Sequence, residues 1–319
     1  MKKKKYIIAS GSVLFALLPQ RAYAKEIGLS VYPPLTRITA NINSSVTTPL
    51  TVGNNSESEV LVDIKIIPFR SSDKNDGSIE YIAAKDVSSD MSSFLSDVKI
   101  IDGDSQIKSI KLYPKEYKKL SLSFTSSSER NKDYYFSVVF STESTSRPSE
   151  NTKDTIANIH TSLASNVLLS VGTLRQPTAR ISELSTSKFV LSGKPEITLA
   201  VTNTSPTFLS ASGNIDIYNM LGKKVQTIPI KRVIILSESE RYLTTDTNLK
   251  GDKITVQKEN LLGMYTAKAV VRINDLETVT QQASFVSLPL FILIMVIIIF
   301  FIFLSILFKV IKKLNFKEK

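Results

Sequence analysis

Apolar and polar residues alternate with a period of two along most of residues 25–287, which indicates half-buried β-strands. The clear alternating runs in the first part are residues 27–32, 60–66, 117–124 and 163–171. Residues 134–140, Tyr-Tyr-Phe-Ser-Val-Val-Phe, are aromatic and β-branched, as is typical of a central strand. Residues 86–96 carry apolar positions at helical spacing and predict one short helix between strands.

The alternation stops at Gly172–Thr178 and then resumes, which predicts a boundary. The strands predicted beyond it are residues 179–184, 196–202, 213–218, 224–230, 240–245, 264–273 and 276–286. Turn-forming residues predict hairpins at Asn75–Gly77, Asp102–Asp104, Leu221–Lys224 and Gly251–Asp252. The Ser/Thr/Glu-rich residues 141–154 predict a solvated loop.

Two segments on either side of this boundary resemble each other. Residues 50–55 read Leu-Thr-Val-Gly-Asn-Asn before a serine, and residues 199–205 read Leu-Ala-Val-Thr-Asn-Thr-Ser. Each is an apolar strand that ends at asparagine and precedes another strand, so we expect a turn capped by the Asn side chain in both places. Pro33-Pro34 follows the first strand and predicts an edge strand or a sharp turn, with a switch between sheets.

Short strands at this spacing predict an all-β fold of two tandem immunoglobulin-like β-sandwiches plus one C-terminal transmembrane helix. The first sandwich is assigned to residues 25–175 and the second to residues 176–287. One long mixed β-domain is the alternative. The 263 residues from 25 to 287 are enough for two domains of ordinary size.

The N-terminus has the pattern of a secretory signal peptide, assigned to residues 1–24. Four consecutive lysines, Lys2–Lys5, precede an apolar stretch that ends near Leu18. Ala22-Tyr23-Ala24 supplies the small-residue pattern that precedes cleavage, which we place after Ala24. An uncleaved anchor helix is the alternative, and the apolar stretch is short for one.

The C-terminus predicts a single membrane span over residues 288–308. These 21 residues carry no charge, and at about 1.5 Å per residue a helix of this length matches the hydrocarbon core of a bilayer. A buried core helix is the alternative, but the stretch is apolar on every face. The tail, residues 309–319, carries five lysines, which indicates a cytoplasmic C-terminus and an extracellular ectodomain in a single-pass protein of the cell membrane.

The net charge of +11 belongs mostly to the two ends of the chain. Residues 1–24 carry five positive charges and the tail a net four, which leaves +2 for residues 25–308. The folded part therefore does not have the basic character of a nucleic-acid-binding protein. Because the chain has no cysteine, its exported part must be stabilised by a hydrophobic core rather than by disulfides. Cysteine-free exported chains rich in Lys, Ile, Asn and Ser fit a bacterial source.

The sequence offers no catalytic constellation, so we predict no catalytic, cofactor-binding or metal-binding residues. His160 is the single histidine; it lies in a predicted strand and has no cysteine or second histidine to share a metal with. Residues 73–80 resemble a calcium loop only faintly and are interpreted as a turn. The binding residues are unknown. The candidate contact positions Tyr32, Tyr113 and Tyr117 are explained at least as well by core packing.

Several motifs resemble the WxL-interacting proteins of Gram-positive bacteria. Residues 27–34 (Ile-Gly-Leu-Ser-Val-Tyr-Pro-Pro) and 48–56 (Thr-Pro-Leu-Thr-Val-Gly-Asn-Asn-Ser) are similar to the start of those proteins. Residues 134–140 are similar to their late central strand, and residues 213–223 and 262–269 to strands of their second domain. The resemblance implies a first domain that binds peptidoglycan and a second domain that contacts partner surface proteins.

We therefore expect a non-enzymatic, membrane-anchored cell-surface binding or scaffolding protein. Its expected partners are a cell-wall polymer or a surface protein, with the lipid bilayer contacted through the C-terminal helix. A pilus-chaperone-like module that donates a strand to a partner is the first alternative. A membrane-anchored hydrolase is the second; it would have to use His160, without a recognisable nucleophile motif.

Overall fold

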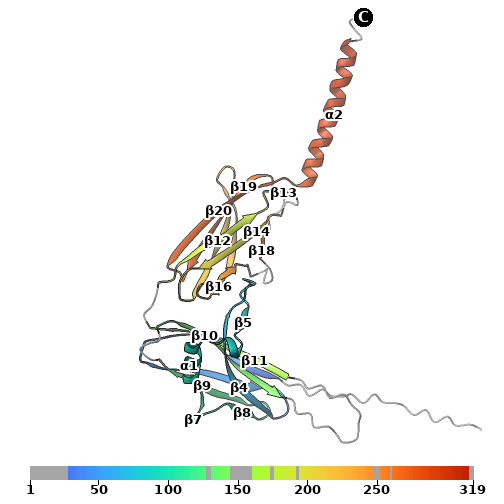
Figure 1. Cartoon of the computed structure of the whole chain (residues 1–319). Helices are drawn as coiled ribbons and strands as arrows, with labels where there is room; N and C mark the ends of the chain where they lie inside the picture. The colour runs from blue at the N-terminus through green and yellow to red at the C-terminus, as the bar shows by residue number, and fades with distance from the viewer. Residues whose placement is uncertain are drawn as a thin grey trace, which may run out of the picture.

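The computed structural model describes residues 28–126, 131–143, 160–172, 176–191, 194–246, 252–258 and 261–315. The expected signal peptide, most of the expected loop at 141–154 and the last four residues lie outside the described residues. Within these ranges the chain is mostly β-strand, with an apolar helix at its C-terminal end, as predicted (Figure 1).

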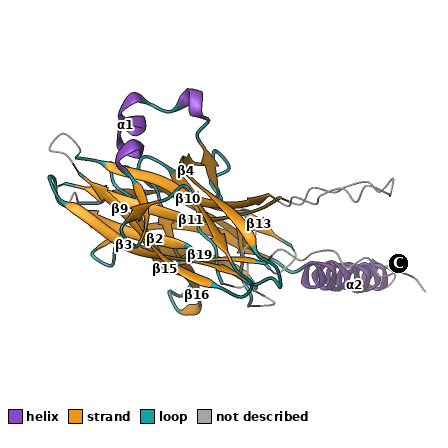
Figure 2. Ribbon diagram, turned by 90° about the horizontal axis from the view of Figure 1, so that it is seen from below, coloured by secondary structure: helices purple, strands orange, loops and turns teal. Residues whose placement is uncertain are grey.

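The strands before Gly172, here called the N-terminal sheets, form two sheets. Their bounds are β1 (Leu29–Tyr32), β2 (Leu35–Ala40), β3 (Ser45–Asn54), β4 (Val60–Ser71), β5 (Ile79–Tyr81), β6 (Lys99–Asp102), β7 (Ser105–Gln106), β8 (Ser109–Leu112), β9 (Tyr117–Thr125), β10 (Asp133–Glu143) and β11 (His160–Val171). One sheet has the order β1-β3-β9-β6-β7; the other has the order β2-β11-β10-β4-β5, with β8 also paired to β4. A helical turn, η1 (Ala84–Asp86), and the short helix α1 (Ser89–Asp97) connect β5 to β6 and lie at one side of the strands (Figure 2).

The strands after Gly172, here called the C-terminal sheets, form two further sheets. Their bounds are β12 (Ala179–Thr186), β13 (Phe189–Val190), β14 (Glu196–Asn203), β15 (Leu209–Asn219), β16 (Lys224–Ile235), β17 (Glu240–Tyr242), β18 (Lys253–Thr255), β19 (Gly263–Ile273) and β20 (Glu277–Ser287). One sheet has the order β12-β14-β17, with β18 also paired to β14, and the other has the order β13-β20-β19-β15-β16.

The strand order of the C-terminal sheets repeats that of the N-terminal sheets. In each group the first strand pairs with the third in one sheet, as β1 does with β3 and β12 with β14. The second strand crosses to the other sheet and pairs in parallel with the last strand, as β2 does with β11 and β13 with β20. The predicted switch between sheets at Pro33-Pro34 is therefore confirmed, because these prolines separate β1 from β2.

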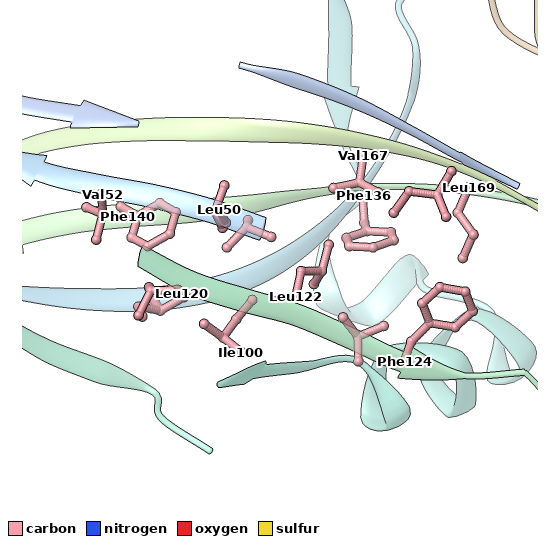
Figure 3. Close-up of a cluster of buried hydrophobic side chains, with 14 of the residues drawn as sticks. Leu50, Val52, Ile100, Leu120, Leu122, Phe124, Phe136, Phe140, Val167 and Leu169 are labelled. Atoms are coloured by element: carbon pink, nitrogen blue, oxygen red, sulfur yellow. The ribbon is translucent and has the colours of Figure 1, made fainter. Parts of the chain in front are cut away.

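Each group of sheets encloses its own hydrophobic core. In the N-terminal sheets, side chains from β3 and β9 face those from β10 and β11, with Leu122 and Phe136 near the centre (Figure 3). Phe94 of α1 is fully buried and stacks on Tyr134, with ring centroids 4.0 Å apart. The C-terminal core contains Leu199, Ile215 and other buried residues from the strands after Gly172. The predicted period-two alternation arises because every second residue of these strands points into one of the two cores.

The C-terminal helix α2 (Leu290–Asn315) projects away from the strands (Figures 1 and 2). Its residues Leu290–Lys309 form a segment long and apolar enough to cross a membrane, and none of that segment is buried against the rest of the chain. The helix begins two residues later than the predicted span, because the backbone N–H of Leu288 still bonds to the Val190 carbonyl. It also continues into the lysine-rich tail as far as Asn315.

Asn54 caps the turn after β3, as predicted from the sequence. Its side-chain N–H groups donate to the carbonyls of Ser58 (2.8 Å), Leu112 (3.3 Å) and Tyr113 (3.0 Å). Its Oδ1 accepts from the backbone N–H and the hydroxyl of Ser56, at 3.0 and 2.6 Å. Asn54 is fully buried, so it ties the end of β3 to the end of β8 inside the fold.

Asn203 makes the same set of bonds after β14. Its side-chain N–H groups donate to the carbonyls of Thr207 (2.7 Å), Ile235 (3.2 Å) and Leu236 (2.8 Å). Its Oδ1 accepts from the backbone N–H and the hydroxyl of Ser205, at 2.9 and 2.6 Å. The similar sequences at residues 50–55 and 199–205 therefore form the same hydrogen-bond pattern. Asn203 bonds to the end of β16 where Asn54 bonds to the end of β8.

Candidate functional site

The N-terminal and C-terminal sheets meet at a junction that is partly polar. Asp133 begins β10, and its Oδ2 accepts from the Thr207 hydroxyl (2.9 Å) and the Phe208 backbone N–H (2.8 Å) of the other group. The same oxygen accepts from the Tyr135 hydroxyl (3.1 Å), which in turn accepts from the Ser237 N–H (3.2 Å). Burial raises the pKa of Tyr135 well above its usual value, and the negative charge of Asp133 raises it further, so the hydroxyl stays protonated as a donor.

Apolar side chains pack beside this polar contact. Phe69, Tyr135 and Leu168 of the N-terminal sheets are buried against Phe208 and Ile234 of the C-terminal sheets. The Tyr135 ring stacks on Phe69 at 6.2 Å and meets Phe208 edge-on at 6.4 Å. The two groups of sheets are therefore joined by a packed contact as well as by the chain.

The tip of the β4–β5 hairpin makes a third contact across the junction, and Figure 1 shows β5 reaching toward the C-terminal sheets. The Asn75 carbonyl accepts from the Tyr242 N–H of β17 (2.7 Å), and the Asn75 side chain donates to Glu240 (3.0 Å). Gly77, at a φ of +84°, lies against the guanidinium of Arg241 so closely that a Cβ would sit 2.0 Å from its Cζ. The predicted turn at Asn75–Gly77 is confirmed, and it has a partner in the other half of the chain.

A cleft of about 550 Å³ opens between these contacts and is called the junction cleft below. The N-terminal sheets line it with Leu35, Leu168 and the hairpin tip. The C-terminal sheets line it with residues 231–236, in and just after β16, and with residues 239–242 and Thr244, in and around β17. An apolar wall with a few polar groups from two packed units is the usual composition of a ligand site.

Arg241 is the most unusual polar group of the junction cleft. One of its terminal N–H groups donates to the Ile234 carbonyl (2.8 Å), while its Nε is buried and has no hydrogen-bond partner among the described residues. Burial lowers the pKa of Arg241 from its usual value, and the charge of Asp76 opposes that change. A half-buried guanidinium that lines a cleft can stabilise an anion there.

The acidic groups of the junction cleft already have donors. Glu240 accepts from Asn75 and, through its second oxygen, from the Thr202 hydroxyl at 3.0 Å. Asp76 accepts from the Ser78 N–H at 2.8 Å, and the bonds from Ser78 hold the pKa of that carboxyl below its usual value. The side chain of Lys231 is exposed at the cleft. Lys231 and Arg241 are therefore groups of the cleft that could bind a negatively charged ligand.

The tyrosines singled out in the sequence do not line this cleft. Tyr32, Tyr113 and Tyr117 are 71, 59 and 62% exposed, so core packing, the competing explanation for them, is wrong. Tyr32 and Tyr117 share the outer face of the first sheet, because Tyr32 is opposite Thr51 and Tyr117 opposite Gly53. The Tyr117 hydroxyl donates to the side chain of Asn55.

The remaining residue that the sequence analysis singled out is His160. His160 begins β11 opposite Glu143, and both side chains lie outside the described part. Among the described residues no group of three or more His, Asp or Glu side chains could hold a metal ion. Sequence reasoning missed Asp133 and Arg241, because each acts through a residue more than 70 positions away along the chain.

The comparisons with known proteins give similarity of structure only. No family model matches the chain, and no curated protein matches its sequence. A chain of the CsuC–CsuE chaperone–tip adhesion subunit complex of Acinetobacter baumannii is 13% identical, with a TM-score of 0.36, over 82% of this chain and all of that one. The E. coli chaperone DraB is 12% identical, with a TM-score of 0.37, over 82% of this chain and 97% of its own. A chain from the Salmonella enterica SafA pilin–SafB chaperone complex is 11% identical, with a TM-score of 0.37, over 82% and 98%.

Proposed function

We propose that this chain is a non-enzymatic, membrane-anchored binding protein of the cell surface, and that its junction cleft takes a carboxylate group of its ligand. The observation that carries the proposal is Arg241, a half-buried arginine that lines a cleft of about 550 Å³. Carboxylates occur on acidic side chains of surface proteins and on the peptides of cell-wall polymers, and the experiment below separates these two sources.

The physical argument for a carboxylate is the match between its two oxygens and a guanidinium. Arginine donates through a planar fork, and a carboxylate accepts two parallel hydrogen bonds from it. The bond from Arg241 to the Ile234 carbonyl and the contact with Gly77 fix the plane of this fork before the ligand arrives. A fixed donor reduces the ordering that binding would otherwise require.

The proposed placement of the protein follows from α2. Its apolar residues Leu290–Lys309 would span the bilayer, and the lysines that follow would keep the C-terminus in the cytoplasm. The repeated strand order and the paired Asn54 and Asn203 turns support two tandem immunoglobulin-like domains outside the cell, divided near residue 175. This layout also fits the WxL-interacting resemblance, which stays a proposal.

The test uses the full chain in lipid nanodiscs, with isolated cell wall and solubilised surface proteins of the source organism as separate ligands. We expect saturable binding to one of them. Arg241→Gln should weaken it by about 30-fold or more, since losing one partner of a buried charge pair costs roughly 2–5 kcal/mol. Lys231→Gln, an exposed change at the cleft, should weaken it less without threatening the fold. Arg272→Gln, exposed on β19 and outside the cleft lining, is the matched control.

Two results would refute the proposal. One is the absence of saturable binding to either ligand by a well-folded protein. The other is binding that Arg241→Gln and Lys231→Gln leave as strong as Arg272→Gln does. Binding to cell wall alone, or to a surface protein alone, would identify the source of the carboxylate.

A second candidate function, strand addition, is favoured by one edge of β11. Strand β2 pairs with β11 only from Asn166 to Val171, whereas β10 pairs with residues 160–170, so residues 160–165 have no partner on their outer edge among the described strands. The Asn166 N–H points to that edge, where it donates to the Pro34 carbonyl (2.9 Å). Since N–H groups alternate along a strand, those of Ser162 and Ala164 point the same way. A partner strand could pair there.

Ala164→Pro tests this candidate, because it removes an outward N–H and leaves the bonds to β10 in place. We expect a captured surface protein to be lost with Ala164→Pro and retained with Ala164→Ser, which keeps the N–H. Equal capture by both variants would exclude strand addition at this edge.

A further inference from the structure

Several exposed apolar side chains gather at the end of the C-terminal sheets where α2 begins. They come from three loops: residues 188–191 before and within β13, residues 219–223 between β15 and β16, and residues 261–264 at the start of β19. Together these are called the membrane-end loops. Their exposed apolar residues are Phe189 (75%), Leu191 (51%), Met220 (75%), Leu221 (83%), Leu262 (52%) and Met264 (58%).

The strand register places these loops level with one another and with the start of α2. Gly263 is opposite Ser287, three residues before α2 begins at Leu290. Asn219 is opposite Tyr265, so the β15–β16 hairpin extends to the same end. Val190 is paired in parallel with Ser287 as well. Figure 1 shows β13 and the upper ends of the C-terminal sheets beside the start of α2.

The connection between this end and α2 is direct. The Leu191 carbonyl accepts from the N–H of Leu290, the first residue of α2, at 3.0 Å. The turn at the tip of the β15–β16 hairpin is closed by Asn219, whose Oδ1 accepts from the N–H groups of Leu221 (3.1 Å) and Lys223 (2.9 Å). The Leu221 side chain is therefore held outward by an ordered turn, although an exposed leucine gains nothing from water.

The charges on the described part of these loops are positive. Lys188 and Lys223 lie beside the apolar residues and are exposed, and Lys258 lies near the start of β19 and is exposed too. Asp216 of β15, an acidic residue close to the hairpin, is 8% exposed and bonded to Thr227 (2.6 Å) and Lys224 (3.6 Å). Apolar tips with lysines around them match a lipid surface, where the apolar groups enter the acyl boundary and the lysines meet anionic headgroups.

We infer that the membrane-end loops insert into the outer leaflet and seat the C-terminal sheets on the bilayer around α2. The inference rests on the proposed anchoring by α2. The partner of the membrane-end loops is the lipid itself, because the loops adjoin the start of α2 and α2 is embedded in the bilayer. The protein would then stand upright on the membrane, with the junction cleft held away from the lipid surface instead of swinging on the few residues between β20 and α2.

The test uses the natural absence of tryptophan in the chain, which makes any introduced tryptophan a unique probe. Single variants of the full chain would be placed in nanodiscs of phosphatidylcholine and phosphatidylglycerol, with and without brominated acyl chains that quench tryptophan. Leu221→Trp reports on the membrane-end loops, and Phe189→Trp repeats the measurement from β13. Phe300→Trp reports on α2. Leu276→Trp is the matched control, because it is 88% exposed on the β19–β20 turn, about 34 Å along the strands from Gly263.

We expect Leu221→Trp and Phe189→Trp to emit at shorter wavelength than Leu276→Trp. We also expect bromolipid to quench them by about half as much as Phe300→Trp, since interfacial groups lie roughly 5–10 Å deep. If Phe300→Trp is quenched but the two loop probes behave like Leu276→Trp, the inference is wrong and the anchor stands. If Phe300→Trp is not quenched, the anchor itself fails. Blue-shifted loop probes without quenching would mean that protein covers these loops, which also overturns the inference.

Discussion

The Asn54 turn allows a quantitative test of how the N-terminal sheets are held together. Asn54→Ala removes five hydrogen-bond contacts from a fully buried site: those of its two side-chain N–H groups, shared among three carbonyls, and the two that its Oδ1 accepts. The Ser56 hydroxyl can still donate to the Ser58 carbonyl (2.9 Å), so its contact with Asn54 is not counted and four contacts are lost. At roughly 1 kcal/mol net for each bond, we expect a loss of about 4 kcal/mol in the free energy of unfolding.

The assay is urea denaturation of the full chain in nanodiscs, followed by far-ultraviolet circular dichroism. With a denaturant dependence of about 2 kcal/mol per M, the midpoint should fall by about 2 M at unchanged slope. Asn203→Ala should have an effect of the same size on the C-terminal sheets, because its bonds are equivalent. Asn55→Ala is the control, since Asn55 is exposed next to the cap and its loss should cost less than about 1 kcal/mol.

The reasoning would be refuted if Asn54→Ala lowered the free energy of unfolding by less than about 1 kcal/mol, the size of one net hydrogen bond. It would also be refuted if Asn55→Ala had as large an effect. Either result would mean that the neighbouring carbonyls find other donors when the cap is removed, and that the repeated motif is not a structural requirement.

Three further predictions concern the junction and the first core. Tyr135→Phe should reduce the loss of stability that begins near pH 10. Above that pH the tyrosine hydroxyl ionises in the unfolded chain, whereas burial and Asp133 raise its pKa in the folded chain, so stability falls as the pH rises. Denaturation midpoints on either side of pH 10 measure the difference between the two proteins. Gly77→Ala should lower the free energy of unfolding by about 1–3 kcal/mol, because the alanine Cβ would clash with the Arg241 guanidinium and the φ of +84° at this position disfavours residues other than glycine. The same variant should also weaken ligand binding in the junction cleft. Phe94→Ala should lower the free energy of unfolding by about 3–5 kcal/mol, as expected for a fully buried aromatic side chain, with calorimetry as the measurement.

Much of the fold could be predicted because a two-sided strand records its surroundings in its own sequence. The alternation at residues 117–124 became β9, with Leu120, Leu122 and Phe124 buried, and the aromatic run at residues 134–140 became the central part of β10, between β4 and β11. Seven of the described strands were missed: β2, β5, β6, β7, β8, β13 and β18. All but β2 have two to four residues, and each forms because another strand offers it a pairing edge, which no local pattern records.

The candidate site could not be predicted, because none of its parts is unusual alone. Arg241 lies in a segment that the sequence assigned to a strand, and Asn75–Gly77 lies in a segment assigned to a turn. Only folding brings the two together, with Gly77 leaving the space that the guanidinium fills. For Tyr32, Tyr113 and Tyr117 the sequence identified the residues, but it could not decide whether they lie on the outer face of a sheet or in the core.

The sequence by itself determined the properties that are periodic or local. These are the β character of the described residues between 29 and 287, the apolar segment of α2, and the two Asn-capped turns, because side-chain alternation, length and a short motif each suffice for them. The tertiary structure alone decided the junction contacts of Asp133, the junction cleft with Arg241 and the gathering of the membrane-end loops around α2. These features depend on which strand edges meet and in what register, and that is set by packing between residues far apart in the chain.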